Sequence, residues 1–140
     1  IAASVGAPLA HVGQEDFFDA GHTHVSELQP QKPGLRFGLS SHEPEQALRA
    51  VAAGAAYVAI GPVYATPTKP GRPGVTVTYV RWAANHLQHR PWFAIGGINA
   101  TNLDEVLEAG ATRVCIVRAI LDSPDIAAAC REFRRRLPAG

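Results

Sequence analysis

The dipeptide Gly-Ala stands three times at the same distance before a short, mostly apolar segment, and this repeat constrains the fold more than any other feature. The copies are Gly6-Ala7 before Leu9–Gly13, Gly54-Ala55 before Tyr57–Gly61, and Gly110-Ala111 before Arg113–Val117. Glycine suits the left-handed position just past the end of a helix. Each copy is therefore predicted to join the end of a helix to the start of a strand.

Two further apolar segments follow prolines, Leu35–Ser40 after Pro33 and Trp92–Ile95 after Pro91. The five predicted strands lack strict alternation, which is typical of strands covered on both faces. Helices are expected between them, and their start signals are Ser41, Thr76, Thr101 with Asp104, and Ser123-Pro124-Asp125. Between Asp16 and Pro33 only a short helix around Val25–Gln29 is expected.

This alternation predicts parallel strands with right-handed crossovers, in either a doubly wound sheet or part of a (β/α)8 TIM barrel. Polar or glycine-rich clusters end all five strands: Gly13–Asp16, Ser40–His42, Thr66–Lys69, Gly96-Gly97 and Arg118. They favour the barrel, because a doubly wound sheet would concentrate such groups near one switch point.

The length of 140 residues suits only about the last five βα units, because a whole barrel runs to ~250 residues. The chain contains no Met and begins with Ile1. We therefore expect residues 1–140 to be the C-terminal part of a single barrel domain, with the remaining units before Ile1.

Composition argues against several classes of partner. The net charge is +1 and no basic stripe is interleaved with aromatic residues, so nucleic acid is not an expected partner. No apolar run approaches the ~20 residues of a membrane span, and no signal peptide is visible. Cys115 and Cys130 are expected to be buried, reduced thiols of a cytoplasmic protein. His22 and His24 are interpreted as polar loop residues, with a metal site as the alternative.

The loop after Tyr57–Gly61 carries two hydroxyls and one ammonium between prolines. Thr66, Thr68 and Lys69 alternate with Pro67 and Pro70, which fix φ and stiffen the backbone. This arrangement predicts an oxyanion site, and a capped proline turn with an exposed lysine is the structural alternative.

Two other strand ends predict binding of phosphate and metal. Gly96-Gly97 before a helix, together with Val114–Ile120, resembles the phosphate site that many barrels build from their last two strands. An ordinary tight turn is the alternative at Gly96-Gly97. The two carboxylates in Gly13–Asp16 would share this rim with two anion sites, which suggests Mg²⁺ bridging a diphosphate.

Five motifs carry a resemblance to the thiamine phosphate synthase family: HVGQED (His11–Asp16), GLSSH (Gly38–His42), GPVYATPTK (Gly61–Lys69), AIGGI (Ala94–Ile98) and VCIVRAI (Val114–Ile120). The resemblance spans the whole chain in the right order. It implies a (β/α)8 barrel that joins a pyrimidine diphosphate to a thiazole phosphate and releases pyrophosphate, with Mg²⁺.

By motif, the resemblance implies Asp16 as a metal ligand, Ser40 and Lys69 on the pyrimidine diphosphate, and Thr66 and Thr68 on the thiazole. Gly97 with Val117 and Arg118 would bind the thiazole phosphate, although the family usually has Ser or Gly where Arg118 stands. The family's Gln/Arg/Lys diphosphate segment and second acidic metal motif would lie before Ile1, so the activity is expected of the full-length parent and not of residues 1–140 alone.

Two alternatives stay open. The TenI-type thiazole tautomerase is a close relative in which the histidine matching His42 transfers a proton, but it usually lacks TPTK. A non-catalytic partial barrel that binds a ligand is the other. The expected partners are the two small substrates, and a homo-oligomer is left open.

Overall fold

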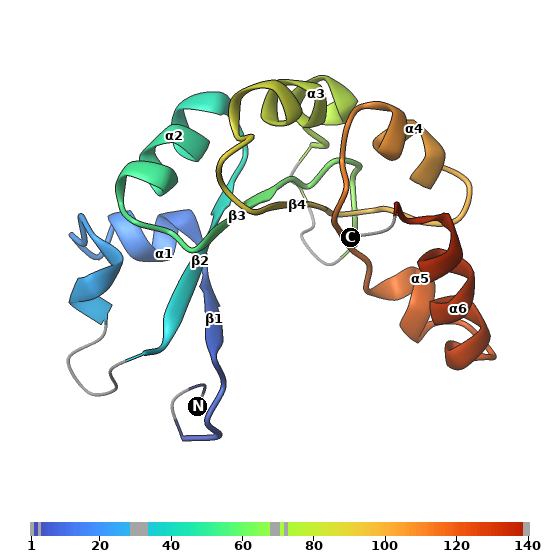
Figure 1. The fold of residues 1–140 in the computed structure, drawn as a ribbon, viewed down its shortest axis with the longest axis horizontal. Coiled ribbons are helices and arrows are strands. Elements are labelled where there is room, and N and C mark those ends of the chain that lie inside the picture. Colours follow the sequence, from blue (N-terminus) through green and yellow to red (C-terminus); the bar gives the residue numbers. More distant parts are fainter. Residues whose placement is uncertain (1, 3, 29–33, 68–70, 72, 139–140) are drawn as a thin grey trace.

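The computed structural model describes residues 2, 4–28, 34–67, 71 and 73–138. In these residues five strands form one parallel sheet in the order β1-β2-β3-β4-β5. The strands are β1 (Leu9–Val12), β2 (Arg36–Ser41), β3 (Tyr57–Ile60), β4 (Trp92–Ile95) and β5 (Val114–Cys115). The sheet and its helices form an arch, a half-barrel, which is the architecture that the polar clusters at the strand ends favoured (Figure 1).

Helices follow each strand and cover one face of the sheet. They are α1 (Gln14–Phe18), the 3-10 helix Val25–Leu28, α2 (Pro44–Ala52), α3 (Thr76–His86), α4 (Leu103–Glu108), α5 (Arg118–Leu121) and α6 (Ile126–Arg136). Figure 1 shows α2, α3 and α4 along the convex side of the arch. The core lies between this side of the sheet and the helices, where Leu39, Val58 and Ile60 are fully buried.

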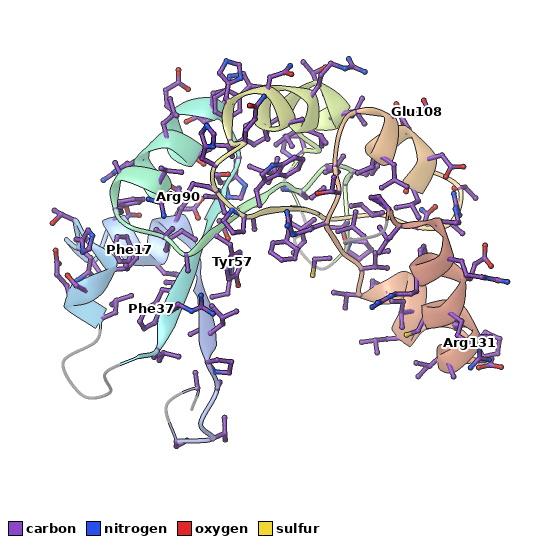
Figure 2. The ribbon with its side chains drawn as sticks, in the orientation of Figure 1. Phe17, Phe37, Tyr57, Arg90, Glu108 and Arg131 are labelled. Atoms are coloured by element: carbon purple, nitrogen blue, oxygen red, sulfur yellow. The ribbon has the colours of Figure 1, made fainter. Side chains whose placement is uncertain are left out.

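The opposite, concave face carries the alternate residues of each strand. His11, Gly38 and Tyr57 are register partners across β1, β2 and β3, so their side chains share this face. Ser40 lies two residues after Gly38 and therefore also points to the concave side. Figure 2 shows Tyr57 on the side of the sheet away from α2 and α3.

The predicted strands are confirmed, with bounds that differ by at most one residue except at the end of the chain. There the expected strand Arg113–Val117 is reduced to the two residues of β5. The short helices α1 and α5 were not expected. Each has at most five residues, too few to show an apolar period in the sequence.

Two of the predicted helix starts are wrong. Ser41 ends β2 and does not cap α2, which begins at Pro44 after Glu43. α4 begins at Leu103, and the Thr101 hydroxyl bonds to Asn99 Oδ1 at 2.7 Å, so Thr101 and Asp104 form no capping box. In contrast, the Asp125 carboxylate accepts from Ala128 N at 2.8 Å and caps α6 as expected.

Only a small part of the apolar surface of α6 is buried. Phe133 is the one buried residue of this helix in the described chain, Ile126 is 48% exposed and Cys130 is exposed. The prediction that both cysteines are buried is therefore wrong for Cys130, and Cys115 is only half-buried. Arg136 holds the end of α6 to the rest of the protein by donating to Asp104 Oδ1 and Ala100 O, both at 2.7 Å.

Candidate active site

A cavity of about 560 Å³ opens at the carboxyl ends of the strands on the concave side of the half-barrel. All five strand ends contribute to it. The described residues that line it are His11, Ser40, His42, Ala59, Gly61, Pro62, Ala65, Thr66, Pro67, Ile95, Gly96, Gly97, Ile98, Asn99, Cys115, Val117, Arg118, Ala119 and Asp122. Of the residues expected to act from separate strand ends, Ser40, Thr66, Gly97, Val117 and Arg118 thus lie around one space.

Ser40 is buried in β2 and points into the cavity. Its Oγ lies 2.9 Å from Nε2 of His11, and His11 Nδ1 lies 3.0 Å from the Tyr57 hydroxyl. The imidazole also stacks on the Tyr57 ring, with centroids 5.5 Å apart. Ser40 is therefore one end of a chain of polar groups that crosses three neighbouring strands, which the sequence patterns did not reveal.

The turn after β1 brings two carboxylates to the same edge of the sheet. Asp16 is exposed in the first turn of α1, and its Oδ2 lies so close to Gly13 that a Cβ there would stand 2.6 Å from it. Glu15 Oε1 lies 3.5 Å from Nε2 of His42. Asp16 itself is not among the residues that line the cavity.

Asp16 fits a Mg²⁺ site in which most of the ligands come from a bound substrate and water. No group of three or more His, Cys, Asp or Glu that could enclose a metal occurs in the described part of the chain. Mg²⁺ is commonly held by one or two carboxylates together with substrate phosphates and water. One exposed carboxylate at the rim, as Asp16 provides, is compatible with that coordination.

His42 connects the turn after β1 to the segment after β3. Its Nδ1 donates to the Gly61 carbonyl, and its backbone N–H donates to Gln46 Oε1 at 2.8 Å. Its buried Nε2 makes no hydrogen bond in the described structure and faces Glu15 at 3.5 Å. A buried imidazole nitrogen beside a carboxylate is a group that can exchange a proton with a ligand.

Ser41, next to these groups, has a structural role. It points to the convex side, where its hydroxyl donates to Ala59 O at 3.0 Å and lies 2.8 Å from the Tyr79 hydroxyl. Tyr79 is also 2.7 Å from Glu43 O, and burial raises the pKa of its phenol. These contacts tie α3 to β2 behind the cavity.

The loop after β3 supplies Thr66 to the cavity, where the residue is half-buried. Thr68 and Lys69, the other two groups of the expected oxyanion site, lie outside the described residues. The structure therefore places one of the three side chains predicted for this site.

Gly96 and Gly97 line the cavity after β4 with positive φ angles of 98° and 66°. Their missing side chains face the neighbouring segment. A Cβ at Gly96 would stand 2.4 Å from Pro62 Cβ, and a Cβ at Gly97 would stand 2.7 Å from Tyr64 Cβ. The sequence analysis expected these glycines to admit a phosphate, and the geometry adds that they also let two loops pack together.

Asn102 holds this turn in place, a role that the sequence analysis missed. Its amide nitrogen donates to Gly97 O at 3.0 Å, and its Oδ1 accepts from Asn99 N at 2.8 Å. Asn99 Oδ1 in turn accepts from Thr101 N at 2.8 Å. Asparagine pairs of this kind are typical of tight turns, and that is the signal that could have identified them.

Val117 and Arg118 reach the cavity from the end of β5, and both are exposed. Arg118 Nε donates to Asp122 Oδ2 at 3.0 Å in an exposed ion pair, which orients the guanidinium. Cys115 also lines the cavity, and burial raises the pKa of its thiol. An anion bound here would contact the side of the Arg118 guanidinium that does not bond to Asp122.

The H-x-H pair, His22 and His24, lies near the start of β3, whereas the cavity lies at the carboxyl ends of the strands. His24 Nε2 would stand 2.5 Å from a Cβ at Gly54, which precedes β3. The Glu27 carboxylate accepts from the Thr23 hydroxyl at 2.7 Å and lies 3.2 Å from His22 Nδ1. These bonds lower the pKa of Glu27 to about 2. The geometry indicates a closed polar turn, the interpretation preferred from the sequence.

A family profile and two curated proteins that match this chain carry the same description, thiamine phosphate synthase. A family profile described as "Thiamine monophosphate synthase" matches residues 1–120. A curated protein named thiamine-phosphate synthase from Thermus thermophilus is 50% identical over 98% of this chain and 63% of its own length. The protein of the same name from Deinococcus radiodurans is 47% identical over 98% of this chain and 47% of its own length.

Two solved structures share the fold of this chain. Thiamine phosphate pyrophosphorylase from Pyrococcus furiosus has a TM-score of 0.79 and 27% identity, over 96% of this chain and 61% of that one. A 3-hexulose-6-phosphate synthase has a TM-score of 0.64 and 25% identity, over 98% of this chain and 65% of that one. The chain thus spans between 47% and 65% of the length of these relatives.

Proposed function

The chain belongs to the thiamine monophosphate synthase family, and from this premise we propose that the protein joins hydroxymethylpyrimidine diphosphate to thiazole phosphate, giving thiamine phosphate and pyrophosphate. One observation carries the proposal. Ser40, Thr66, Gly97 and Arg118 come from four strand ends and line one cavity. Each belongs to a motif that resembles the family.

The reaction proposed is a displacement at the methylene carbon of the pyrimidine. The bond from this carbon to the diphosphate oxygen breaks, and its electron pair leaves with pyrophosphate. The electron-rich pyrimidine ring stabilises the cation that is left, and the lone pair of the thiazole nitrogen forms the new C–N bond. Such a step depends on neutralising the charge of the leaving group, because that charge develops in the transition state.

The residues of the chain supply the donors that this step requires. We assign Ser40 and Lys69 to the diphosphate, where the hydroxyl donates a hydrogen bond and the ammonium offsets the developing charge. Thr66 and Thr68 would contact the thiazole. Gly97, Val117 and Arg118 would bind the thiazole phosphate, with Arg118 pairing while Asp122 orients its guanidinium.

We assign Mg²⁺ to the diphosphate as well. Asp16 would hold the ion at the rim beside β1, and the remaining ligands would be substrate oxygens and water. When bound, the ion would neutralise charge on the departing pyrophosphate. Its neighbour Glu15 faces His42, so the geometry leaves Asp16 as the carboxylate of this turn for the metal.

The cytoplasm is the compartment we propose, because the structure gives Cys115 and Cys130 as free thiols, and such thiols are usual where glutathione keeps them reduced. No helix in the described residues is long and apolar enough to cross a membrane. Self-association to a homo-oligomer stays open.

One observation favours a second candidate, the thiazole tautomerase. His42 lines the cavity with a buried Nε2 that faces the Glu15 carboxylate, which is an arrangement suited to moving a proton on a thiazole ring. The synthase is preferred because the threonines and lysine of Thr66–Lys69 match the motif that the tautomerase usually lacks.

Turnover with substrates omitted in turn tests the proposal. Pyrophosphate release and thiamine phosphate formation, followed together, are expected only when the pyrimidine diphosphate, the thiazole phosphate and Mg²⁺ are all present. Isomerisation of a thiazole carboxylate phosphate without any pyrimidine substrate would instead assign the protein as the tautomerase. A protein that binds both substrates but forms neither product would support the ligand-binding alternative.

A further inference from the structure

We propose that His11 and Tyr57 are positioning residues that fix the hydroxyl of Ser40 as a donor to the diphosphate. This inference rests on the proposed function, since it names how one residue of that site is oriented. The three groups form a relay in which Tyr57 donates to His11 Nδ1, His11 Nε2–H donates to Ser40 Oγ, and the Ser40 hydroxyl proton is left for the ligand. The observed separations are 3.0 Å and 2.9 Å.

The architecture of the sheet makes the relay specific. His11, Gly38 and Tyr57 stand in one row across three strands, so a side chain at position 38 would lie between the other two. A Cβ at Gly38 would stand 2.1 Å from Cζ of Tyr57. The phenol can therefore cross β2 to reach His11 only because residue 38 is glycine.

The direction of the hydrogen bonds is inferred from the proton that Ser40 must keep for the ligand, because the Tyr57 and Ser40 hydroxyls can each donate or accept. A neutral imidazole carries one proton, so one ring nitrogen donates and the other accepts. Burial, and to a lesser extent Cys115, raises the pKa of Tyr57, so its phenol keeps its proton and can donate to Nδ1. His11 then carries its proton on Nε2 and donates to Ser40.

The opposite tautomer would disable Ser40. If Nδ1 carried the proton, Nε2 would accept the hydroxyl proton of Ser40, which could then only accept from a ligand. An oxyanion has no proton to give, so that arrangement would turn a lone pair of Ser40 toward negative charge. Tyr57 thus sets the tautomer of His11, and His11 sets the direction of the Ser40 hydroxyl.

The tautomer can be measured without any reference to turnover. Long-range proton–nitrogen NMR of the full chain labelled with ¹⁵N-histidine, with inorganic pyrophosphate added, distinguishes the two neutral forms. The signal of His11 is identified by its loss in His11→Gln. The relay predicts the Nε2–H form in the wild type and a mixture of forms in Tyr57→Phe. The Nδ1–H form in the wild type would overturn it.

A double-mutant cycle tests whether His11 acts through Ser40. We expect His11→Ala and Ser40→Ala each to lower kcat for pyrophosphate release ~10-fold, the equivalent of one hydrogen bond. The double variant should be no slower than Ser40→Ala, because the two residues supply a single interaction. His11→Gln, whose amide nitrogen reaches the position of Nε2, should recover most of the rate. Additive losses in the double variant would contradict the relay.

The controls separate this inference from the proposed function. His89→Gln changes an exposed histidine in the turn before β4 and should leave kcat and the tautomer of His11 unchanged. If the wild type shows no turnover with both substrates, the proposed function fails. The relay is then decided by the tautomer, together with the same cycle measured as affinity for inorganic pyrophosphate.

Discussion

The phenol of Tyr64 donates a 2.6 Å hydrogen bond to the carboxylate of Glu105 and so joins the loop after β3 to α4. The same residue bonds through its backbone N–H to Gly96 O at 3.1 Å, and its Cβ stands against Gly97. The loop that carries Thr66 and the turn that carries Gly97 are therefore held together by Tyr64. In the proposed reaction these two segments would bind the two ends of the thiazole phosphate.

Alkaline pH should weaken this connection. Burial and the bond to Glu105 raise the pKa of Tyr64 from 10.0 to about 12. Because the folded pKa is the higher one, the stabilisation is complete below pH 10.0 and is lost as the pH rises through about 12. Urea unfolding across this interval should show a smaller loss of stability in Tyr64→Phe than in the wild type.

Glu105→Gln is the matched control for that titration, because the amide keeps an acceptor and removes the charge. We expect Tyr64 to ionise at lower pH in this variant, followed by the near-ultraviolet absorbance of tyrosinate. An unchanged midpoint would mean that Glu105 has no influence on the phenol.

Replacing Gly97 by alanine should destabilise the protein in two ways. Its φ of 66° is strained for alanine, and the added Cβ would stand 2.7 Å from Tyr64 Cβ. Gly21→Ala is the control, because Gly21 has a φ of 85° and nothing within 4 Å of an added Cβ. We expect Gly97→Ala to lower the free energy of unfolding by ~1–3 kcal/mol more than Gly21→Ala does. Equal losses in urea unfolding would show that the contact with Tyr64 is not restrictive.

Cys115 offers a chemical probe of the cavity. In Cys130→Ser it is the one remaining thiol, since the sequence has two cysteines. Burial raises the pKa of Cys115, so its thiolate, the reactive form, should appear only at more alkaline pH than in a free cysteine. Alkylation should therefore speed up as the pH rises beyond the ordinary thiol range. Thiazole phosphate with pyrophosphate should slow it.

A rate of alkylation that is indifferent to these ligands would place them elsewhere than the cavity. Cys130 in the converse variant, Cys115→Ser, is exposed on α6 and should react at the same rate with and without ligand. The pair of variants therefore distinguishes protection in the cavity from a general effect on the protein.

Much of the fold could be predicted because buried parallel strands occur in a sequence as short apolar segments. The segment Trp92–Ile95 was predicted with its observed bounds, and the Gly-Ala repeat located three others. The short helices α1 and α5 could not be predicted, and α1 is stabilised by burying Phe17 rather than by a local pattern. Ser41 looked like a cap because its partners, Ala59 and Tyr79, are distant in sequence.

Some of the residues that line the cavity were predictable, but their connections were not, and Asp16 was expected at the site yet does not line the cavity. Ser40, Thr66, Gly97, Val117 and Arg118 were all expected, and all line the cavity. The relay from Tyr57 through His11 depends on a register between strands 46 residues apart, which no local pattern encodes. One signal was available, because Gly38 stands inside an apolar strand, and such a glycine often marks a close approach by another group.

The central claim is that the diphosphate leaves from this cavity with its charge neutralised by groups at the strand ends. The most direct test is kcat for pyrophosphate release by Lys69→Ala, beside Lys32→Ala, which changes the other lysine of the chain. With both substrates and Mg²⁺ present, we predict a loss of ~100-fold or more for Lys69→Ala and none for Lys32→Ala. Undiminished turnover by Lys69→Ala would contradict the account.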